Sequence, residues 1–319
     1  MESFRLVLEK YQGFIYLIFT LLGTFTGIFW KEFANFIQGL LLPILAILLY
    51  STFCQVKLLH LPRAFLNYKL ILASLIGNFV IIPFFVSIIL LPIDSLVIKI
   101  GIALVLLVPC TDWFVTFSYL GKADTRHAIA LLPILLIFQL FLLPFYLFLF
   151  FPEVISISIE KEEVINTFLG LIILPLILAF LTQKWADSSI IVNKILNITV
   201  WFPVPLVSIV VFVIFSSQAY LIVELRNFLP LLTLIFSVFL VFALVTSKII
   251  SKAMNLTSLD GRVLAFNFGT RNSFLVLPIA LSLPEELRVT ATIVVYQSLI
   301  ELFGMLLFIR FVPNKIFPY

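Results

Sequence analysis

The sequence predicts an all-α membrane protein whose ten transmembrane helices form two inverted five-helix repeats. The first observation behind this prediction is composition: 63% of the 319 residues are apolar and 11% are charged, against about 45–50% and about 25% in soluble domains. The second is that apolar stretches of about 18 or more residues, enough to cross a bilayer, recur along the whole chain. The third is that two of these stretches, half a chain apart, carry similar polar interruptions. The gaps between stretches are too short to hold a soluble domain.

Ten apolar windows define the expected helices. The first window follows Glu2 and Glu9, is too long for the core of a signal peptide, and has no small-residue cleavage site after it. We therefore expect it to be a retained first helix. The ten expected spans are residues 12–30, 35–55, 70–92, 97–119, 128–151, 164–182, 195–217, 228–250, 262–283 and 289–311.

The basic residues predict the orientation of the chain. With ten spans, both termini and four alternate loops share one side, and that side carries 14 of the 20 Lys and Arg residues. Cytoplasmic loops are rich in Lys and Arg, so we expect both termini in the cytoplasm and the protein in the cell membrane. The net charge of +4 lies in short loops, so it indicates orientation and not nucleic-acid binding.

An internal repeat relates the fourth span to the ninth. The triplet Cys110-Thr111-Asp112 aligns with Gly269-Thr270-Arg271, at an offset of 159 residues, and Gln139 and Gln297 follow at matching distances. Five spans per half is an odd number, so residues 160–319 would enter the bilayer inverted relative to residues 1–159. Inverted repeats with interrupted helices are typical of secondary transporters, whose substrates bind near the bilayer midplane where the broken helices meet. A chance match of the two triplets is the alternative.

Pro109 predicts an interruption of the fourth span. Proline removes a backbone donor and clashes with the carbonyl one turn earlier. In lipid the freed polar groups must be satisfied by protein or water, so a break is tolerated where it lines a cavity. A packed kink without function is the alternative, since other spans also contain proline.

Three charged residues lie deep in the expected spans: Asp112, Arg271 and Glu301. A charge at that depth costs roughly 2.5–3.5 kcal/mol even on insertion scales. The repeat predicts that Asp112 and Arg271 face each other across the crossing helices, where pairing offsets part of this cost. Glu301 lies one helical turn after Gln297, and such a carboxyl suits a group that takes up and releases a proton. A purely structural ion pair and a packing role for Glu301 are the alternatives.

Cys110 is the most reactive residue type at the fourth-span break. Thiolate is a soft ligand that suits soft centres, although most buried cysteines, such as Cys54, act as small apolar residues. We expect no metal or cofactor, because His60 and His127 lie at span ends and no metal-ligand cluster or catalytic grouping is present, which also argues against an enzyme. The candidate substrate-binding residues are Cys110, Thr111, Asp112, Thr270, Arg271, Asn272 and Ser273, supported by Pro109, Gly269, Gln139 and Gln297.

The segment PCTDWFVTFSYL at residues 109–120 resembles the PCT-x-x-x-V-x-x-SYL stretch of the arsenical-resistance permeases, in the bile acid/sodium symporter superfamily. Further similarity runs through LLLPILAILLYSTFCQV, IGNFVIIPFFV, FNFGTRNSFLVLPIAL and QSLIELFGM, close to the branch labelled arsenic resistance protein. The resemblance implies ten helices in two inverted repeats, with a panel of spans 1, 2, 6 and 7, a core of spans 3–5 and 8–10, and spans 4 and 9 unwound where they cross. It also implies that Cys110 is required for arsenite transport.

The sequence departs from these relatives at several positions. Sodium-coupled relatives carry Ser and Asn ligands in span 4 and Glu and Gln in span 9, where this chain has Phe114 and Val115, then Asn267 and Arg271. A guanidinium repels sodium, so the resemblance implies that sodium coupling is lost. The permeases also carry a glutamate in span 9, where this chain has Leu275, whereas Glu301 matches a carboxylate that they keep in span 10.

These observations lead to one functional hypothesis with competitors. The leading hypothesis is a proton-coupled exporter of arsenite or a similar small oxyanion, with Cys110 on As(III), Thr111 and Arg271 on the oxygens, and Asp112 and Glu301 exchanging protons. The alternative is a cation-coupled carrier of an organic anion, with Arg271 as the carboxylate partner. A sensor or scaffold is disfavoured because the chain has no soluble output domain.

Overall fold

The protein is described by a computed structural model. It describes residues 2–55, 67–111, 113–151, 169–186, 188–217, 227–284, 287 and 289–318. Within these ranges the regular structure is helical, as the composition predicted. All statements below concern these residues.

Five described helices are long and apolar enough to cross a membrane. They are Tyr68–Leu90, Thr125–Phe150, Leu169–Ala186, Leu229–Ala253 and Val289–Ile316. A sixth candidate is the pair Phe14–Phe29 and Lys31–Gln38, which is bent by 120° at its break. A multi-pass membrane protein follows from these helices. The count of ten spans and the inverted halves 1–159 and 160–319 stay predictions.

Besides the fourth and ninth spans, for which the sequence predicted breaks, two further expected spans are divided in the structure. The expected span 35–55 consists of α2 (Lys31–Gln38) and α3 (Leu41–Gln55), and the expected span 195–217 falls on α13 (Ile190–Thr199) and α14 (Pro203–Ser217). Pro203 is the first residue of α14, a position where its missing N–H group is of no consequence. Hydropathy reports composition and not backbone breaks, so such divisions are not visible in an apolar window.

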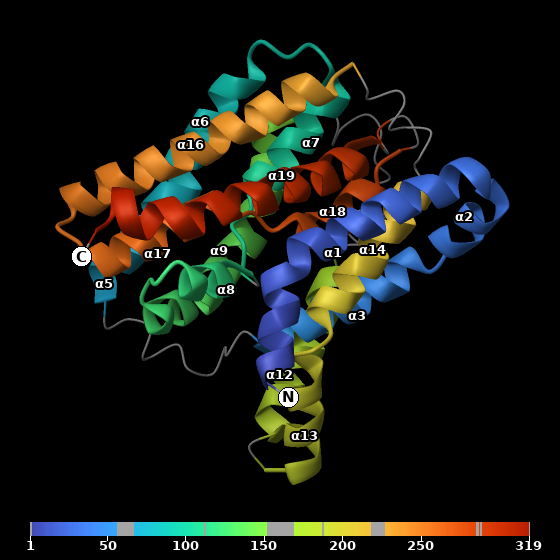
Figure 1. Ribbon diagram of the computed structural model, residues 1–319, viewed down its shortest axis with the longest axis horizontal. Coiled ribbons are helices and arrows are strands. Elements are labelled where there is room, and N and C mark those ends of the chain that lie inside the picture. Colours follow the sequence, from blue (N-terminus) through green and yellow to red (C-terminus); the bar gives the residue numbers. More distant parts are fainter. Residues whose placement is uncertain are drawn as a thin grey trace. The chain divides into compact units, whose positions relative to one another are not determined.

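The chain divides into two compact units built from interleaved segments. Unit 1 comprises Met1–Gln55, Ser158–Pro230 and Leu277–Leu299. Its helices include α1 (Glu2–Phe29), which lies alongside α14 (Figure 1), and α12 (Leu174–Ala186), which continues the π-helical turn η4 (Leu169–Ile173). The Gln183 amide donates to the Phe53 carbonyl at 3.0 Å and so joins α12 to α3.

Unit 2 comprises Val56–Ile157, Leu231–Val276 and Ile300–Tyr319. Its first half contains α5 (Tyr68–Ile76), η3 (Gly77–Ile81), α6 (Ile82–Leu90), α7 (Leu96–Leu106), α8 (Trp113–Leu120) and α9 (Thr125–Phe150). Its second half contains α17 (Ser258–Gly269), η6 (Val312–Ile316) and nearly all of α16 (Leu229–Ala253). The helices α18 (Ser273–Leu281) and α19 (Val289–Phe311) belong to unit 2 only through Val276 and from Ile300 onward, and the rest of each belongs to unit 1. The central helix is α17, which packs on α5, α8 and α9.

A polar cluster joins the starts of three helices in unit 2. Asp260, in the first turn of α17, accepts hydrogen bonds from the Thr257 hydroxyl at 2.9 Å and the Asn67 amide at 3.2 Å. Its other oxygen lies 2.7 Å from Nδ1 of His127, at the start of α9. Asn67 and Thr257 are themselves the N-caps of α5 and α17, so the cluster fixes these helix ends relative to one another.

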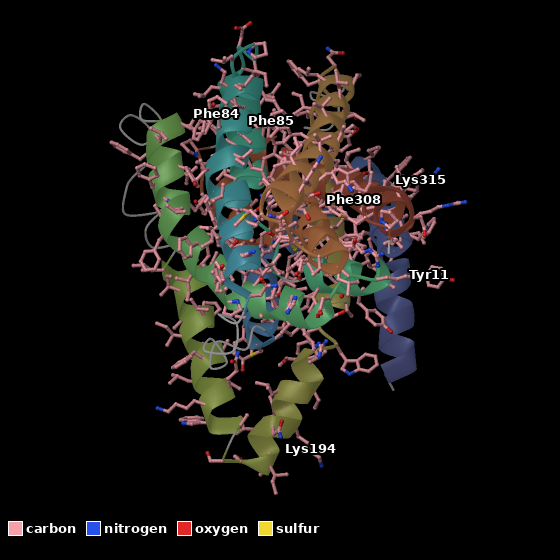
Figure 2. The ribbon with its side chains drawn as sticks, turned by 90° about the vertical axis from the view of Figure 1, so that its left-hand side faces the viewer. Tyr11, Phe84, Phe85, Lys194, Phe308 and Lys315 are labelled. Carbon is pink, nitrogen blue, oxygen red and sulfur yellow. The ribbon has the colours of Figure 1, made fainter. Side chains whose placement is uncertain are left out.

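Aromatic side chains pack α6 against α16 in unit 2. Phe85 of α6 stacks on Phe242 of α16, with ring centroids 3.6 Å apart and planes 1° from parallel. Its neighbour Phe84 is 68% exposed, as expected of a lipid-facing side chain (both are labelled in Figure 2). One face of α6 therefore packs on protein and the other is free for lipid.

Candidate functional site

The two interrupted helices of unit 2 meet at their breaks. The chain leaves helical geometry after α7 at Leu106 and resumes with α8 at Trp113, and it breaks again between Gly269 of α17 and Ser273 of α18. Pro109 and Arg271 form an antiparallel bridge. The Cys110 N–H donates to the Thr270 carbonyl at 3.2 Å, and the Asn272 N–H donates to the Val108 carbonyl at 2.9 Å.

This pairing leaves three helix carbonyls without their usual donors. In an α-helix the carbonyl of residue i accepts the N–H of residue i+4. The N–H groups that would serve Leu106 and Phe268 are those of Cys110 and Asn272, which cross to the other break. The N–H that would serve Asn267 belongs to Arg271 and donates to the Glu301 carboxylate. Unsatisfied carbonyls in lipid cost several kcal/mol each, so another donor must reach them.

The Arg271 guanidinium is that donor. Nη1 lies 3.2 Å from the Leu106 carbonyl, and Nη2 lies 3.2 Å from the Asn267 carbonyl and 2.8 Å from the Phe268 carbonyl. The side chain is fully buried, and its Cζ lies 5.2 Å from the centroid of the Phe239 ring, within cation–π range. One side chain thus satisfies one carbonyl released at the fourth-span break and two released at the ninth-span break.

Asn78 completes the surroundings of the guanidinium, and the sequence analysis missed it. Its Oδ1 accepts from Nη2 of Arg271 at 2.9 Å, while its Nδ2 donates to Oδ1 of Asn267 at 2.6 Å. The Ser74 hydroxyl donates to the same Asn267 oxygen at 2.8 Å. Asn78 lies in the π-helical turn η3, a feature frequent at functional sites. A lone amide in the apolar run 70–92 was the signal that could have identified it.

Glu301 of α19 is bound to the ninth-span break. Its Oε2 accepts the main-chain N–H of Arg271 at 2.8 Å, and the residue is fully buried. The close approach of α19 requires Gly269, because a Cβ there would lie 2.8 Å from Phe308 (labelled in Figure 2) and from Met305. The sequence predicted a deep carboxylate at Glu301, and the structure adds its contact with the break.

Cys110 and Thr111 lie in the fourth-span break and are both buried. The Thr111 hydroxyl accepts from the Asn272 amide at 3.1 Å, and the Asn272 Oδ1 accepts from the Leu275 N–H at 3.2 Å, which caps the start of α18. A side-chain hydrogen bond thus joins the two breaks through Thr111 and Asn272, the residues that follow Cys110 and Arg271 in the chain.

The remaining predicted site residues are Asp112, Gln139, Gln297 and Ser273. Asp112 lies outside the described residues, so its predicted pairing with Arg271 stays a prediction. Gln139 is buried in α9, and its amide has no hydrogen-bond partner among the described residues. Gln297 is buried one turn before Glu301, and Ser273 is buried as the first residue of α18.

The described residues contain no group of three His, Cys, Asp or Glu side chains that could hold a metal ion. The site instead offers hydrogen-bond donors and acceptors, one thiol and opposite charges. Such a set suits a small polar solute that binds and leaves.

The chain is similar in sequence to a known protein family. A sequence profile of the Sodium Bile acid symporter family matches residues 42–225, more than half of the 319 residues. The chain belongs to this family. A comparison with curated proteins finds no match.

Members of the Sodium Bile acid symporter family are transporters, so membership indicates a membrane transporter with a small-molecule substrate and not an enzyme. The matched residues include the fourth-span break with Pro109, Cys110 and Thr111, and end before Arg271 and Glu301. The family match supports the resemblance of the sequence to the bile acid/sodium symporter superfamily. It does not distinguish the arsenic-resistance branch.

Proposed function

We propose that the protein is a proton-driven secondary transporter that exports arsenite or a similar small oxyanion by alternating access. The observation that carries this proposal is the pairing of the two helix breaks through Pro109 and Arg271, which gathers Cys110, Thr111, Asn272 and Glu301 in unit 2. Broken helices that meet in this way are typical of the binding sites of secondary transporters. The division of the chain supports a panel and a core in part: the expected panel spans 1, 2, 6 and 7 fall in unit 1 and most of the expected core falls in unit 2, but Leu277–Leu299 of spans 9 and 10 falls in unit 1.

A buried carboxyl group at the break supports protons as the coupling ion. The C-terminal ends of α7 and α17 each carry about half a negative charge and the starts of α8 and α18 each about half a positive charge, so these helix ends offset one another. The remaining charges at the break among the described residues are the Glu301 carboxylate and the Arg271 guanidinium. Proton binding and release at Glu301 would then change the charge of the break during the cycle.

The start of α18 and the thiol support a small oxyanion as substrate. The Thr111 hydroxyl and the Asn272 amide lie at this helix start, where the dipole favours negative charge, and the Cys110 sulfur offers a soft ligand for As(III). The donors on Nη1 and Nη2 of Arg271 end on protein oxygens, whereas its Nε has no hydrogen-bond partner among the described residues. A bidentate pairing of a substrate carboxylate with Arg271, as an organic-anion carrier would use, is therefore disfavoured.

Arsenite tolerance tests the substrate. Expression in a bacterium that lacks its own arsenite exporter should raise the tolerated arsenite concentration, and Cys110→Ser should abolish the gain because the hydroxyl is a poor ligand for As(III). Cys54→Ser is the matched control: Cys54 is also buried but lies in α3 of unit 1, and this variant should keep the gain. Unchanged tolerance on expression, or tolerance that survives Cys110→Ser, would exclude the thiol mechanism.

A further inference from the structure

The site around the Arg271 guanidinium has the composition of a cation-binding site. Four neutral oxygens accept its hydrogen bonds, namely the carbonyls of Leu106, Asn267 and Phe268 and the Oδ1 of Asn78, at 2.8–3.2 Å. We call these four atoms the oxygen cage. Three of them are main-chain carbonyls released by the two breaks, so their positions are fixed by the backbone. Rigid carbonyl and amide oxygens are ligands that suit hard cations.

Electrostatics require a positive charge at this place. The cage lies where the C-terminal ends of α7 and α17 meet, since Leu106 ends one helix and Asn267 and Phe268 belong to the last turn of the other. Two helix C-termini together present about one negative charge. The cage is fully buried, so water cannot screen this charge, and the cation has to come from within the protein or be bound.

We propose that Arg271 is a built-in cation that permanently occupies the oxygen cage, and that the cage binds a free alkali-metal cation when this side chain is shortened and neutral. The native protein then needs no bound cation to hold its two broken helices together. An Arg271→Ala variant becomes dependent on sodium or potassium for its stability. This proposal does not depend on which substrate is carried.

The proposal is tested by measuring the melting temperature of the purified protein in detergent. The solutions contain sodium chloride, potassium chloride or choline chloride at the same ionic strength. The native protein should melt at the same temperature in all three salts. Arg271→Ala should melt lower in choline and recover in sodium or potassium, by roughly 2–4 °C at ten times the dissociation constant. The recovery should saturate with concentration, as binding to one site does and general salt effects do not.

Three further variants make the test specific. Arg262→Ala is the matched control, because Arg262, which lies in α17, is also a fully buried arginine but donates to the Phe317 and Lys122 carbonyls, away from the breaks. This variant should lose stability without any preference among the salts. Arg271→Lys keeps the charge and should stay indifferent to the cation. Adding Asn78→Ala to Arg271→Ala removes one cage oxygen and should weaken the recovery at least tenfold in cation concentration.

Two results would overturn the proposal. One is an Arg271→Ala protein that melts at the same temperature in choline as in sodium and potassium, or that shares its salt response with Arg262→Ala. The other is failure of both Arg271→Ala and Arg271→Gln to fold in any of the three salts, because the vacated oxygens would then bind no free cation. Since melting does not report transport, neither result bears on arsenite export.

Discussion

Arg271 has two roles in the structure: its side chain donates hydrogen bonds to carbonyls at the helix breaks, and its positive charge lies at the negative ends of two helices. A guanidinium at bilayer depth is costly by itself, yet here its donors satisfy three carbonyls that the breaks expose. An isolated charge and a set of isolated carbonyls would each be unfavourable, whereas together they offset one another. A charged residue that is costly in a membrane therefore supplies the hydrogen bonds that the two helix breaks need.

Glu301 provides a test of proton coupling at the residue scale. Glu301→Gln keeps an oxygen that can accept the Arg271 N–H but cannot carry a proton in exchange. We expect flux driven by a pH gradient to fall by roughly tenfold or more, which corresponds to about 1.4 kcal/mol in the barrier, while thermal stability changes little. Arsenite uptake in proteoliposomes with an imposed pH gradient measures this.

Asp94→Asn is the control for Glu301→Gln, because Asp94 is an exposed carboxylate between α6 and α7 of the same unit. It should leave the flux unchanged. Full pH-driven flux in Glu301→Gln would show that this carboxylate is not the proton carrier.

At the scale of elements, the site is made by helix ends and one irregular turn. The C-terminal ends of α7 and α17 receive the guanidinium, the start of α18 is capped by Asn272, and η3 turns Asn78 toward Arg271. The η3 turn also packs closely on α17. A Cβ at Gly77 would overlap the Phe268 ring, so only glycine allows this approach.

Gly77→Ala tests the packing of η3 on α17. Because the added methyl group overlaps Phe268, we expect a loss of about 1–3 kcal/mol in stability, measured as a lower melting temperature in detergent. Gly170→Ala is the matched control, since Gly170 also lies in a π-helical turn and its Cβ would meet no atom within 4 Å. That variant should be neutral or slightly more stable. Equal melting of both variants would contradict the packing described here.

The sequence predicted the elements of the site better than its contacts. Pro109 and the triplet repeat predicted the breaks, and the depth of Arg271 and Glu301 predicted buried charges. The hydrogen-bond exchange at the breaks could not be predicted, because it depends on which carbonyls lose their donors once two segments 160 residues apart lie side by side. Likewise Asn78, an isolated amide in an apolar helix, acquires a role only through its contact with Arg271.

At the scale of the whole molecule, the chain interleaves its two compact units, passing repeatedly from one to the other. The residues of the breaks, Pro109, Cys110, Thr111 and Arg271, lie in unit 2 together with Glu301. The paired breaks are therefore held together within one compact unit.

Orientation is a prediction about the whole chain. The excess of basic residues on one side predicts a cytoplasmic C-terminus. A C-terminal fluorescent protein fusion should therefore be bright in a Gram-negative host, and a C-terminal alkaline phosphatase fusion should be inactive. Truncation and fusion at residue 160 should reverse both signals, because that loop is expected on the opposite side. Active phosphatase at the C-terminus would contradict the predicted orientation.

The most direct test of the account is arsenite flux in proteoliposomes that contain the purified protein, with either a pH gradient or a sodium gradient imposed across the membrane. We predict that the pH gradient accelerates arsenite movement and that the sodium gradient has no effect, because Arg271 holds the place of a cation and Glu301 exchanges protons. Flux that follows the sodium gradient and ignores the pH gradient would contradict it.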